Sequence, residues 1–393
     1  MANVSSSNGL EKRPKLRFPG FDEPWSIYKA EELFKNVADK NHPMETVLTI
    51  IQGKGTLPRE QAGRNIHYDD ASLANYKKVE QGDFIIHLRS FEGGLEMANE
   101  DGIVSPAYTI LRCKKPHSSL FYEAYFHTDE FINHILSKSV EGIRDGRQIS
   151  YEAFKWLGLP YCDVSEQERI AQLFCTLSHR IEKQQRMVDA LKKYKRGVVA
   201  AIFSHQLKFS DATGNPYPEW TSCTLQDAVD FLDGQRKPLE SADRAKRQGQ
   251  YPYYGASGII DYIDDFIFDE PLLLLGEDGA NILNRSTPLC FIAEGKYWVN
   301  NHAHVMRPKA GQNIKFLCEL LESLDYTRYN TGTAQPKLNQ DKCRRIGLAL
   351  PVYEEQCHIA DFLSAFDQRT DKAQSILDYL LSNRDGLLQQ LFI

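Results

Sequence analysis

The chain has 393 residues, of which 42% are hydrophobic and 11% aromatic, and its formal net charge is −6 at pH 7. This length and apolar content suffice for the cores of two ordinary domains and indicate a globular protein rather than a disordered one. The negative charge argues against a simple basic protein that coats DNA, because non-specific affinity comes mainly from Lys and Arg side chains that neutralise phosphates.

Neither a membrane span nor an export signal is evident. No run of about 18 uncharged apolar residues occurs, and the polar, Ser-rich N-terminus lacks the apolar stretch of a signal peptide. The eight cysteines are never closer than 13 residues, so no C-x-x-C metal or redox pair can be drawn. We therefore expect a cytoplasmic protein without membrane contact, whose cysteines are reduced thiols.

The first part of the chain is typical of a β-rich mixed domain. Short apolar runs bounded by Gly, Asn, Asp or Pro predict strands at 83–88 and 108–111. A helix is expected over roughly 122–137.

A long helix is predicted to follow, starting at Ser165, which can form a capping box with Glu168. Seam positions then alternate in steps of four and three, which is the 3.5-residue period of a coiled coil sustained over five heptads. At ~1.5 Å per residue, roughly 38 residues form a helix ~57 Å long. The seam comprises Ile170, Phe174, Leu177, Ile181, Gln184, Val188, Leu191, Lys195, Val198 and Ile202.

The second half of the chain repeats this order. Strands are predicted at 272–275, 290–292 and 297–299, and a helix at 314–324. A second heptad seam follows at Ile359, Leu363, Phe366, Thr370, Ala373, Leu377, Leu380, Arg384, Leu387 and Leu391.

An internal repeat accounts for this order. At an offset of 189 residues, segment 149–203 aligns with 338–392 without a gap, and 13 of 55 pairs are identical. A weaker match precedes each half, where Leu16-Arg-Phe18 with Trp25 resembles Leu207-Lys-Phe209 with Trp220. The predicted division is a tail at 1–19, a first β-rich domain at 20–164, a central long helix at 165–206, a second β-rich domain at 207–353 and a C-terminal long helix at 354–393.

The two long helices carry opposite charge. Residues 165–204 hold eight basic and four acidic side chains, whereas 354–393 hold three basic and seven acidic ones. Opposite charge on a shared heptad register favours pairing of the two helices, and the domain between them lets them run antiparallel. The alternative is that each helix packs only on its own domain. The predicted fold class is α+β: two β-rich mixed domains alternate with two long helices that pair as an antiparallel coiled coil, in a pseudo-twofold repeat.

Short motifs open each long helix. Leu159-Pro160 precedes Glu166-Gln-Glu-Arg-Ile-Ala171, and Leu350-Pro351 precedes Glu354-Glu-Gln-Cys-His-Ile-Ala360. With the layout, these motifs resemble the specificity subunits of type I restriction-modification systems over nearly the whole chain. The first copy has a longer stretch between its Leu-Pro and its helix than the second. Three further segments look like the family's, namely Gly332-Thr-Ala-Gln-Pro-Lys-Leu-Asn339, Leu88-Arg-Ser-Phe-Glu-Gly-Gly94 and Tyr253-Tyr-Gly-Ala-Ser-Gly258.

The resemblance implies a non-catalytic subunit that binds double-stranded DNA. Each β-rich domain would be a target-recognition domain for one half of a split, asymmetric site. The helix pair would hold the two domains at a fixed separation, since dimeric DNA-binding proteins bind half-sites ~34–36 Å apart. Two methyltransferase (modification) subunits and restriction/translocase subunits would dock around the helices. The chain itself would use no cofactor, whereas these partners would use S-adenosylmethionine, ATP and Mg²⁺.

Base readout needs polar side chains on short rigid elements, and Arg paired bidentately with guanine is the commonest specific contact. For any single candidate the alternative is a solvated surface side chain. Gln335 and Lys337 either contact backbone phosphate or cap the second long helix. The candidate DNA-binding residues are Arg59, Arg64, Arg89, Ser90, Arg144 and Arg147 in the first domain, and Gln235, Arg236, Lys237, Arg244, Arg247, Tyr254, Ser257, Asn281, Asn284, Arg285, Asn301, His302, Gln335 and Lys337 in the second.

Two other kinds of site compete with this interpretation. Asp278 with Glu294-Gly-Lys296 has the spacing of a Mg²⁺-dependent nuclease, so a free-standing nuclease, or else a coiled-coil scaffold, is the alternative function. His302-Ala-His304 places two imidazoles on one face of a strand, as metal sites do, but no cysteine is near in sequence, and satisfied or DNA-facing histidines are favoured. No glycine-rich loop for adenosylmethionine and no Gly-x₄-Gly-Lys-Ser/Thr phosphate loop occurs.

Overall fold

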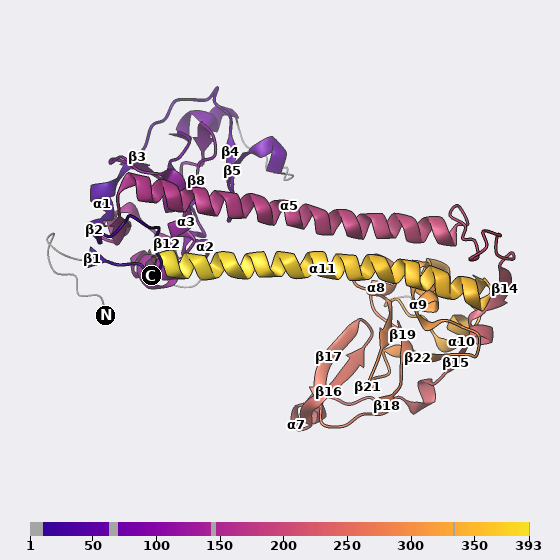
Figure 1. Ribbon diagram of the computed structural model, residues 1–393. Coiled ribbons are helices and arrows are strands. Elements are labelled where there is room, and N and C mark those ends of the chain that lie inside the picture. Colours follow the sequence, from indigo (N-terminus) through magenta and orange to yellow (C-terminus); the bar gives the residue numbers. More distant parts are fainter. Residues whose placement is uncertain (1–10, 63–69, 143–146, 333–334, 393) are drawn as a thin grey trace. The chain divides into compact units, whose positions relative to one another are not determined.

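The computed structural model describes residues 11–62, 70–142, 147–332 and 335–392 (Figure 1). The chain divides into two compact units, unit 1 (Met1–Gln185 with Ser375–Ile393) and unit 2 (Arg186–Gln374). Each unit therefore contains one β-rich domain and one half of each long helix. Among the described residues, no helix combines the length and the apolar character that crossing a membrane requires.

Unit 1 is built on two antiparallel sheets and three short strand pairs. The first sheet has the order β1-β2-β13 and the second the order β3-β10-β7-β8. The strands are β1 (Glu11–Lys12), β2 (Trp25–Lys29), β3 (Phe34–Val37), β4 (Leu48–Ile51), β5 (Gly55–Pro58), β6 (Lys77–Val79), β7 (Phe84–Ile86), β8 (Glu96–Met97), β9 (Gly102–Val104), β10 (Thr109–Cys113), β11 (Val140–Glu141), β12 (Gln148–Ile149) and β13 (Gly158–Tyr161).

Short helices cover these sheets. The α-helices are α1 (Ala30–Leu33), α2 (Ser90–Gly93), α3 (Ser119–Phe126) and α4 (Tyr151–Phe154). The described residues also form the helical turns η1 (Arg59–Ala62), η2 (Asp70–Asn75), η3 (Glu130–Ile135) and η4 (Leu136–Ser139).

Unit 2 repeats the four-stranded sheet in the order β15-β22-β19-β20 and adds a mixed sheet of order β17-β16-β21-β18, in which β16 and β21 are parallel. Strand β14 pairs with β23. The strands are β14 (Thr221–Thr224), β15 (Val229–Phe231), β16 (Gln248–Gly255), β17 (Gly258–Ile263), β18 (Phe268–Asp269), β19 (Leu272–Gly276), β20 (Cys290–Ala293), β21 (Lys296–Val299), β22 (Ala303–Pro308) and β23 (Gly347–Leu350). The helices are α6 (Leu225–Ala228), η6 (Asp233–Gln235), α7 (Ser241–Lys246), α8 (Asn281–Asn284), α9 (Ile314–Ser323), η7 (Thr327–Tyr329) and α10 (Gln340–Arg344).

The predicted strands are confirmed, because each apolar run forms a strand: β7, β10, β19, β20 and β21. The helix predicted at 314–324 is α9, whose Asn313 cap accepts hydrogen bonds from two backbone N–H groups. The helix predicted over 122–137 is wrong as one element. It breaks after Phe126, because the Thr128 side chain bonds the Tyr125 carbonyl and accepts from the Phe131 N–H, which starts a new turn.

The long helices α5 (Val164–Phe203) and α11 (Tyr353–Phe392) match the two heptad patterns closely. The predicted cap of α5 is wrong, since Asp163 rather than Ser165 occupies that position. Asp163 Oδ1 accepts from the Ser165 backbone N–H at 2.8 Å, and the Ser165 hydroxyl also donates to it. The carboxylate satisfies N-terminal donors that have no partner within the helix.

The halves of α5 and α11 pair antiparallel within each unit. In unit 1, Phe174 near the start of α5 stacks on Phe392 at the end of α11, with ring centroids 6.2 Å apart. In unit 2, Tyr194 lies 5.5 Å from Phe366, and Lys195 Nζ lies 2.7 Å from Asp367 Oδ1. These contacts confirm pairing over separate packing of each helix. All of the seam positions are buried or half-buried.

The repeated Glu-Gln motif anchors each long helix to its own domain. Gln167 accepts a hydrogen bond from the Ser118 N–H at 3.0 Å and donates to the Cys162 carbonyl at 2.9 Å. Gln356 does the same with the Asn313 N–H at 2.9 Å and the Pro351 carbonyl at 3.0 Å. Ser118 and Asn313 are the N-cap residues of α3 and α9, so each glutamine ties a long helix to the corresponding short one.

The glutamate of the same motif pairs with an arginine in unit 1, whereas one oxygen of its counterpart in unit 2 has no hydrogen-bond partner among the described residues. Glu166 accepts two hydrogen bonds from Arg17, at 2.9 and 2.7 Å, and one from the Trp25 indole at 2.8 Å. Oε2 of the equivalent Glu355 is buried and has no hydrogen-bond partner among the described residues. Lys208, which the repeat aligns with Arg17, instead lies 3.5 Å from Glu219 at the surface. Burial raises the pKa of Glu355, and a hydrogen bond with the Trp220 side chain offsets this only in part.

We expect Lys208→Arg to stabilise unit 2 by about 1 kcal/mol at pH 7, because a guanidinium can bond Glu355 as Arg17 bonds Glu166. Since the folded pKa of Glu355 is raised, its charge destabilises unit 2 as the pH rises through that pKa. The gain should therefore vanish below the ordinary pKa of glutamate, where the carboxyl is neutral. Urea unfolding at pH 7 and pH 4, with Lys208→Gln as control, measures this, and equal unfolding free energies for both variants at pH 7 would contradict it.

Candidate nucleic-acid interface

Many of the predicted DNA-binding residues lie at the same end of the four-stranded sheet in both units. In unit 1, Arg89 follows β7, and Tyr108 precedes β10, the strand that pairs with β7. In unit 2, Glu277 follows β19, and His302 precedes β22, which pairs with β19 in the same way. The duplicated topology thus presents two equivalent edges, which we call edge 1 and edge 2.

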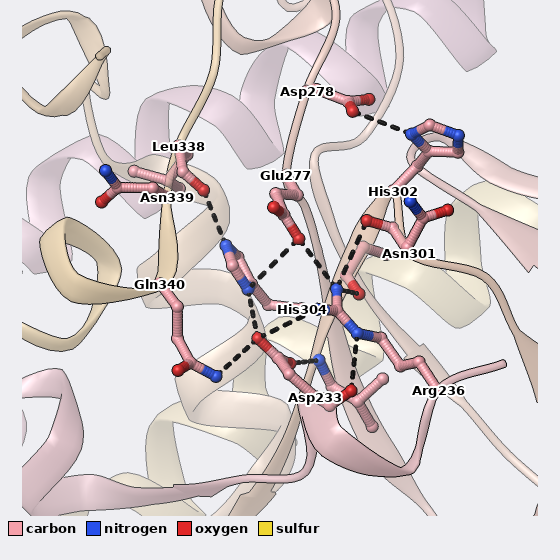
Figure 2. A network of polar contacts seen from close by, with 12 residues as sticks. Asp233, Arg236, Glu277, Asp278, Asn301, His302, His304, Leu338, Asn339 and Gln340 are labelled. Atoms are coloured by element: carbon pink, nitrogen blue, oxygen red, sulfur yellow. Dashed lines mark hydrogen bonds and ion pairs between the residues drawn. The ribbon is translucent and has the colours of Figure 1, made fainter. Parts of the chain in front are cut away.

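A buried ion-pair network underlies edge 2 (Figure 2). Arg236 Nη1 donates to Glu277 Oε2 at 2.8 Å, and Nη2 lies 3.5 Å from Asp233 Oδ2. His304 Nδ1 and Gln340 Nε2 each lie 2.7 Å from that Asp233 oxygen. The five side chains come from four segments that are separated in sequence, so the network fixes the loops of edge 2 relative to one another.

Hydrogen bonding defines the protonation of this network. His304 lies between the Asp233 carboxylate and the Leu338 carbonyl, each at 2.7 Å, and both are acceptors. Both bonds form together only when His304 carries two protons. Burial raises the pKa of Asp233, but the hydrogen bond and charge of His304, the Val305 N–H and the charge of Arg236 outweigh it, so the net pKa is lowered.

Asp233, Glu277 and His304 also have the geometry of a metal site, since one atom of each lies within 4.8 Å of the others. The protein's own cations occupy this space: Arg236 bonds Glu277, and Lys337 Nζ lies 3.4 Å from the other Glu277 oxygen. Because these cations compensate both carboxylates, the arrangement is an ion-pair network rather than a metal centre.

Exposed polar side chains surround the network. Gln235 and Lys237 flank Arg236, Asn301 and His302 precede β22, and Lys337 forms an isolated β-bridge with Asp278. The Asn301 backbone contacts the buried network, because its carbonyl lies 3.5 Å from Arg236 Nη1. Edge 2 therefore combines amide, imidazole and ammonium groups on a rigid base. The side chains of Ser257, Asn284 and Gln335 are also exposed in unit 2.

Other candidates in unit 2 are engaged within the fold. Arg244 bonds Asp261, Arg247 bonds Asp264, and Arg285 bonds the Glu322 carboxylate and carbonyl. The Asn281 side chain bonds backbone and side-chain groups of the turn up to Pro288, and the half-buried Tyr254 ring packs on Phe291 and Tyr297. Arg236 belongs to this group as well, as a member of the buried network.

In unit 1, three of the candidates lie on or next to α2. Arg89 is exposed, whereas Ser90 is buried and its hydroxyl accepts from the His87 N–H at 2.9 Å. The Arg147 guanidinium lies 4.3 Å from the Phe91 ring centroid. Arg59 lies on η1, with its guanidinium 5.9 Å from the Tyr76 ring. Arg64 and Arg144 lie outside the described residues.

The alternative nuclease site does not assemble. Asp278 lies two residues beyond the end of β19, whereas Glu294 follows Ala293, which pairs with Leu272 at the beginning of β19. At ~3.3 Å per residue, the carboxylates are separated by roughly 20 Å along the sheet. Asp278 instead pairs with His302, and Lys296 lies over the Phe266 ring. The alternative of a shared Mg²⁺ site is therefore excluded for Asp278 and Glu294, because strand pairing carries the two carboxylates to opposite ends of the strand.

The sequence interpretation missed the roles of Asp233, Glu277 and Gln340. No local pattern marks them, since Asp233 and Gln340 are 107 positions apart and meet only in the folded unit. The one available signal is the alternation in His302-Ala-His304, which places both imidazoles on one side of the chain, directed toward the two acidic segments.

Comparison with known proteins finds similarity to the same family. Residues 217–380 match the model of the type I restriction modification DNA specificity domain. A putative type I restriction enzyme specificity subunit from Haemophilus influenzae is 32% identical over 155 residues, which are 39% of this chain and 38% of that protein. The EcoprrI specificity subunit from Escherichia coli is 28% identical over 154 residues, 39% of this chain and 37% of its own length. The chain thus aligns with less than two fifths of the length of these curated relatives.

Solved structures share the fold over almost the whole chain. The S subunit of a type I system from M. genitalium matches with a TM-score of 0.60 at 16% identity, covering 97% of this chain and 99% of that one. A chain from a study of complex assembly and conformational transition of the type I R-M system matches with a TM-score of 0.55 at 13% identity, covering 95% of this chain and 98% of that one. Residues 217–380 thus match the type I restriction modification DNA specificity domain, and almost the whole chain shares the fold of solved type I S subunits.

Proposed function

We propose that this chain reads a bipartite, asymmetric DNA site and directs partner subunits to it without catalysing a reaction itself. The observation that carries the proposal is the pair of equivalent sheet edges. Both units share the strand order of the four-stranded sheet, yet edge 1 offers Arg89 and edge 2 offers Asn, Gln, His and Lys. Two sheet edges that share a topology but present different side chains suit the recognition of two different half-sites.

At edge 2, Gln235 and Asn301 have the amides that pair with adenine in the major groove, while Lys237 and Lys337 suit phosphates. At edge 1, Arg89 has the guanidinium that pairs with guanine. The arginines that bond acidic groups inside unit 2 stabilise the fold of this DNA-recognition domain and do not contact bases. The number of exposed basic groups is modest, so partner subunits would supply much of the phosphate contact.

The partners in this proposal are two methyltransferase subunits and restriction/translocase subunits in the cytoplasm. The exposed faces of α5 and α11 suit docking, because they keep large apolar side chains in solvent: Met187, Tyr194, Ile376 and Tyr379. S-adenosylmethionine, ATP and Mg²⁺ would be bound by those subunits.

The test is to co-express the chain with its methyltransferase and to map methylated adenines by single-molecule sequencing. We expect a split motif with an unread spacer that is absent from cells lacking the chain. Arg89→Ala should relax only one half of the motif and Asn301→Ala only the other, because the residues lie on different edges. Methylation that is unchanged without the chain would overturn the proposal.

A further inference from the structure

Edge 2 contains a second, outer histidine that is separate from the buried network. His302 Nδ1 lies 2.8 Å from Asp278 Oδ2, and 50% of the His302 side chain is exposed against 21% for Asp278. Figure 2 shows this pair at the margin of the network, with the His302 ring directed away from Arg236 and His304. The two histidines are only two residues apart, yet His304 is fully buried.

The backbone holds the pair in place. The Glu277 N–H donates to the His302 carbonyl at 2.8 Å, and the His302 N–H donates to Oδ1 of the buried Asn300 at 2.7 Å. Next to Asp278, the Gly279 N–H donates to the Pro336 carbonyl at 3.0 Å. Since both residues are attached to paired strand ends, the imidazole has a defined direction before any ligand arrives.

Asp278 determines which nitrogen of His302 carries the proton. An ionised carboxylate only accepts hydrogen bonds, so Nδ1 must be the donor. In the neutral imidazole, Nε2 is then a hydrogen-bond acceptor, and it has no partner among the described residues. An acceptor beside a carboxylate is unsuited to phosphate but suited to a base that offers an N–H donor.

We propose that His302 is a base-reading residue of edge 2 that accepts a hydrogen bond from an exocyclic amino group, N6 of adenine or N4 of cytosine. Asp278 is its positioning residue and acts by holding the Nδ1–H tautomer. Both amino groups are donors in the major groove, where guanine and thymine offer acceptors at the corresponding place. This inference rests on the proposed function and adds a chemical class of base to one position of the recognised half-site.

Three variants separate this role from a structural one. His302→Ala removes the acceptor, and we expect about tenfold weaker binding to the cognate site with lost selectivity at one position. His302→Gln keeps an amide acceptor and should restore part of that selectivity. In Asp278→Asn, the amide can donate to Nδ1 as well as accept from it, so Nε2 becomes a hydrogen-bond donor in part of the molecules. Binding of duplexes with guanine or thymine at that same position should then become stronger.

His134→Ala in unit 1 is the matched control, because His134 also pairs with an aspartate, Asp129, at 3.6 Å and is exposed. The complex with methyltransferase is used throughout, with methylome mapping and titration of duplexes that carry each base pair at each position. The base whose selectivity is lost in His302→Ala distinguishes adenine from cytosine. Thermal melting checks that every variant is folded.

The outcomes separate the inference from the function beneath it. If the wild-type complex methylates a split motif and His302→Ala leaves every position of that motif intact, the role of His302 is overturned while the proposed function stands. Uniform weakening at all positions would also overturn it, since that is the signature of a phosphate contact. If the wild-type chain imposes no motif at all, the proposed function itself fails.

Discussion

Replacing Arg236 with alanine should lower the unfolding free energy of unit 2 by about 3–5 kcal/mol. Only 14% of the Arg236 side chain is exposed, and its partners Glu277 and Asp233 are 13% and 6% exposed. Removing the guanidinium leaves two buried carboxylates with less compensation, which costs more than the pair contributes when intact. Hydrogen exchange on peptides of unit 2 measures the effect separately from unit 1.

The control is Arg307→Ala. Arg307 bonds Glu270 with equally short contacts, but both side chains are about two fifths exposed. Solvent screening limits such a pair to at most ~1 kcal/mol. Similar losses in the two variants would show that burial of the network contributes nothing.

We also expect Arg236→Ala to weaken DNA binding by edge 2, because the flanking Gln235 and Lys237 lose their support.

The same network has a defined pH dependence. Because the folded pKa of Asp233 is lowered, its contribution to stability is present above the ordinary pKa of aspartate, ~3.9, and is lost as the pH falls through the lowered value. Asp233→Asn should remove that acid-range dependence from unit 2 and leave unit 1 unaffected.

Phe392→Ala should lower the unfolding free energy of unit 1 by about 3–5 kcal/mol. The ring is fully buried at the end of α11 and lies 5.2 Å from Phe121, 5.5 Å from Tyr125 and 6.1 Å from Trp25. It joins the end of the long helix to the core of the β-rich domain, so its loss leaves a large cavity at that junction.

The internal repeat supplies the matched comparison. Phe203 is the residue identical to Phe392 in the first copy, but it is only half-buried, against Trp220 and Phe316. We expect Phe203→Ala to cost roughly half as much, because less apolar surface returns to water. Urea unfolding followed by hydrogen exchange in each unit measures both losses. A larger loss for Phe203→Ala would contradict the burial argument.

The long helices were predictable because their signal is local and repeated. A 3.5-residue period over five heptads locates α5 and α11 to within about three residues at each end, despite the error at the cap, where Asp163 takes the place predicted for Ser165. The internal repeat likewise predicts two domains of one topology, since duplicated sequence folds into duplicated strand order.

Which polar residues can face a ligand was decided by the tertiary structure. In the sequence Arg236, Arg285 and Arg89 are alike, each near a glycine or a turn. In the folded units, Arg236 meets Glu277 across 41 positions and Arg285 meets Glu322 across 37, whereas Arg89 is exposed. The physical reason is that an ion pair forms only where strand pairing brings a guanidinium next to a carboxylate that is distant in sequence. No local sequence pattern encodes that meeting.

Asp278 illustrates the same division. The sequence by itself determined the repeat, the helix pair and the β-rich character of the domains, all of which follow from periodicity and turn residues. It also suggested that Asp278 belongs with Glu294, whereas the register of β19 with β20 and β22 separates these two and places Asp278 beside His302. Register arises from long-range hydrogen bonds and core packing, so only the tertiary structure could decide which chemistry this edge of the sheet presents.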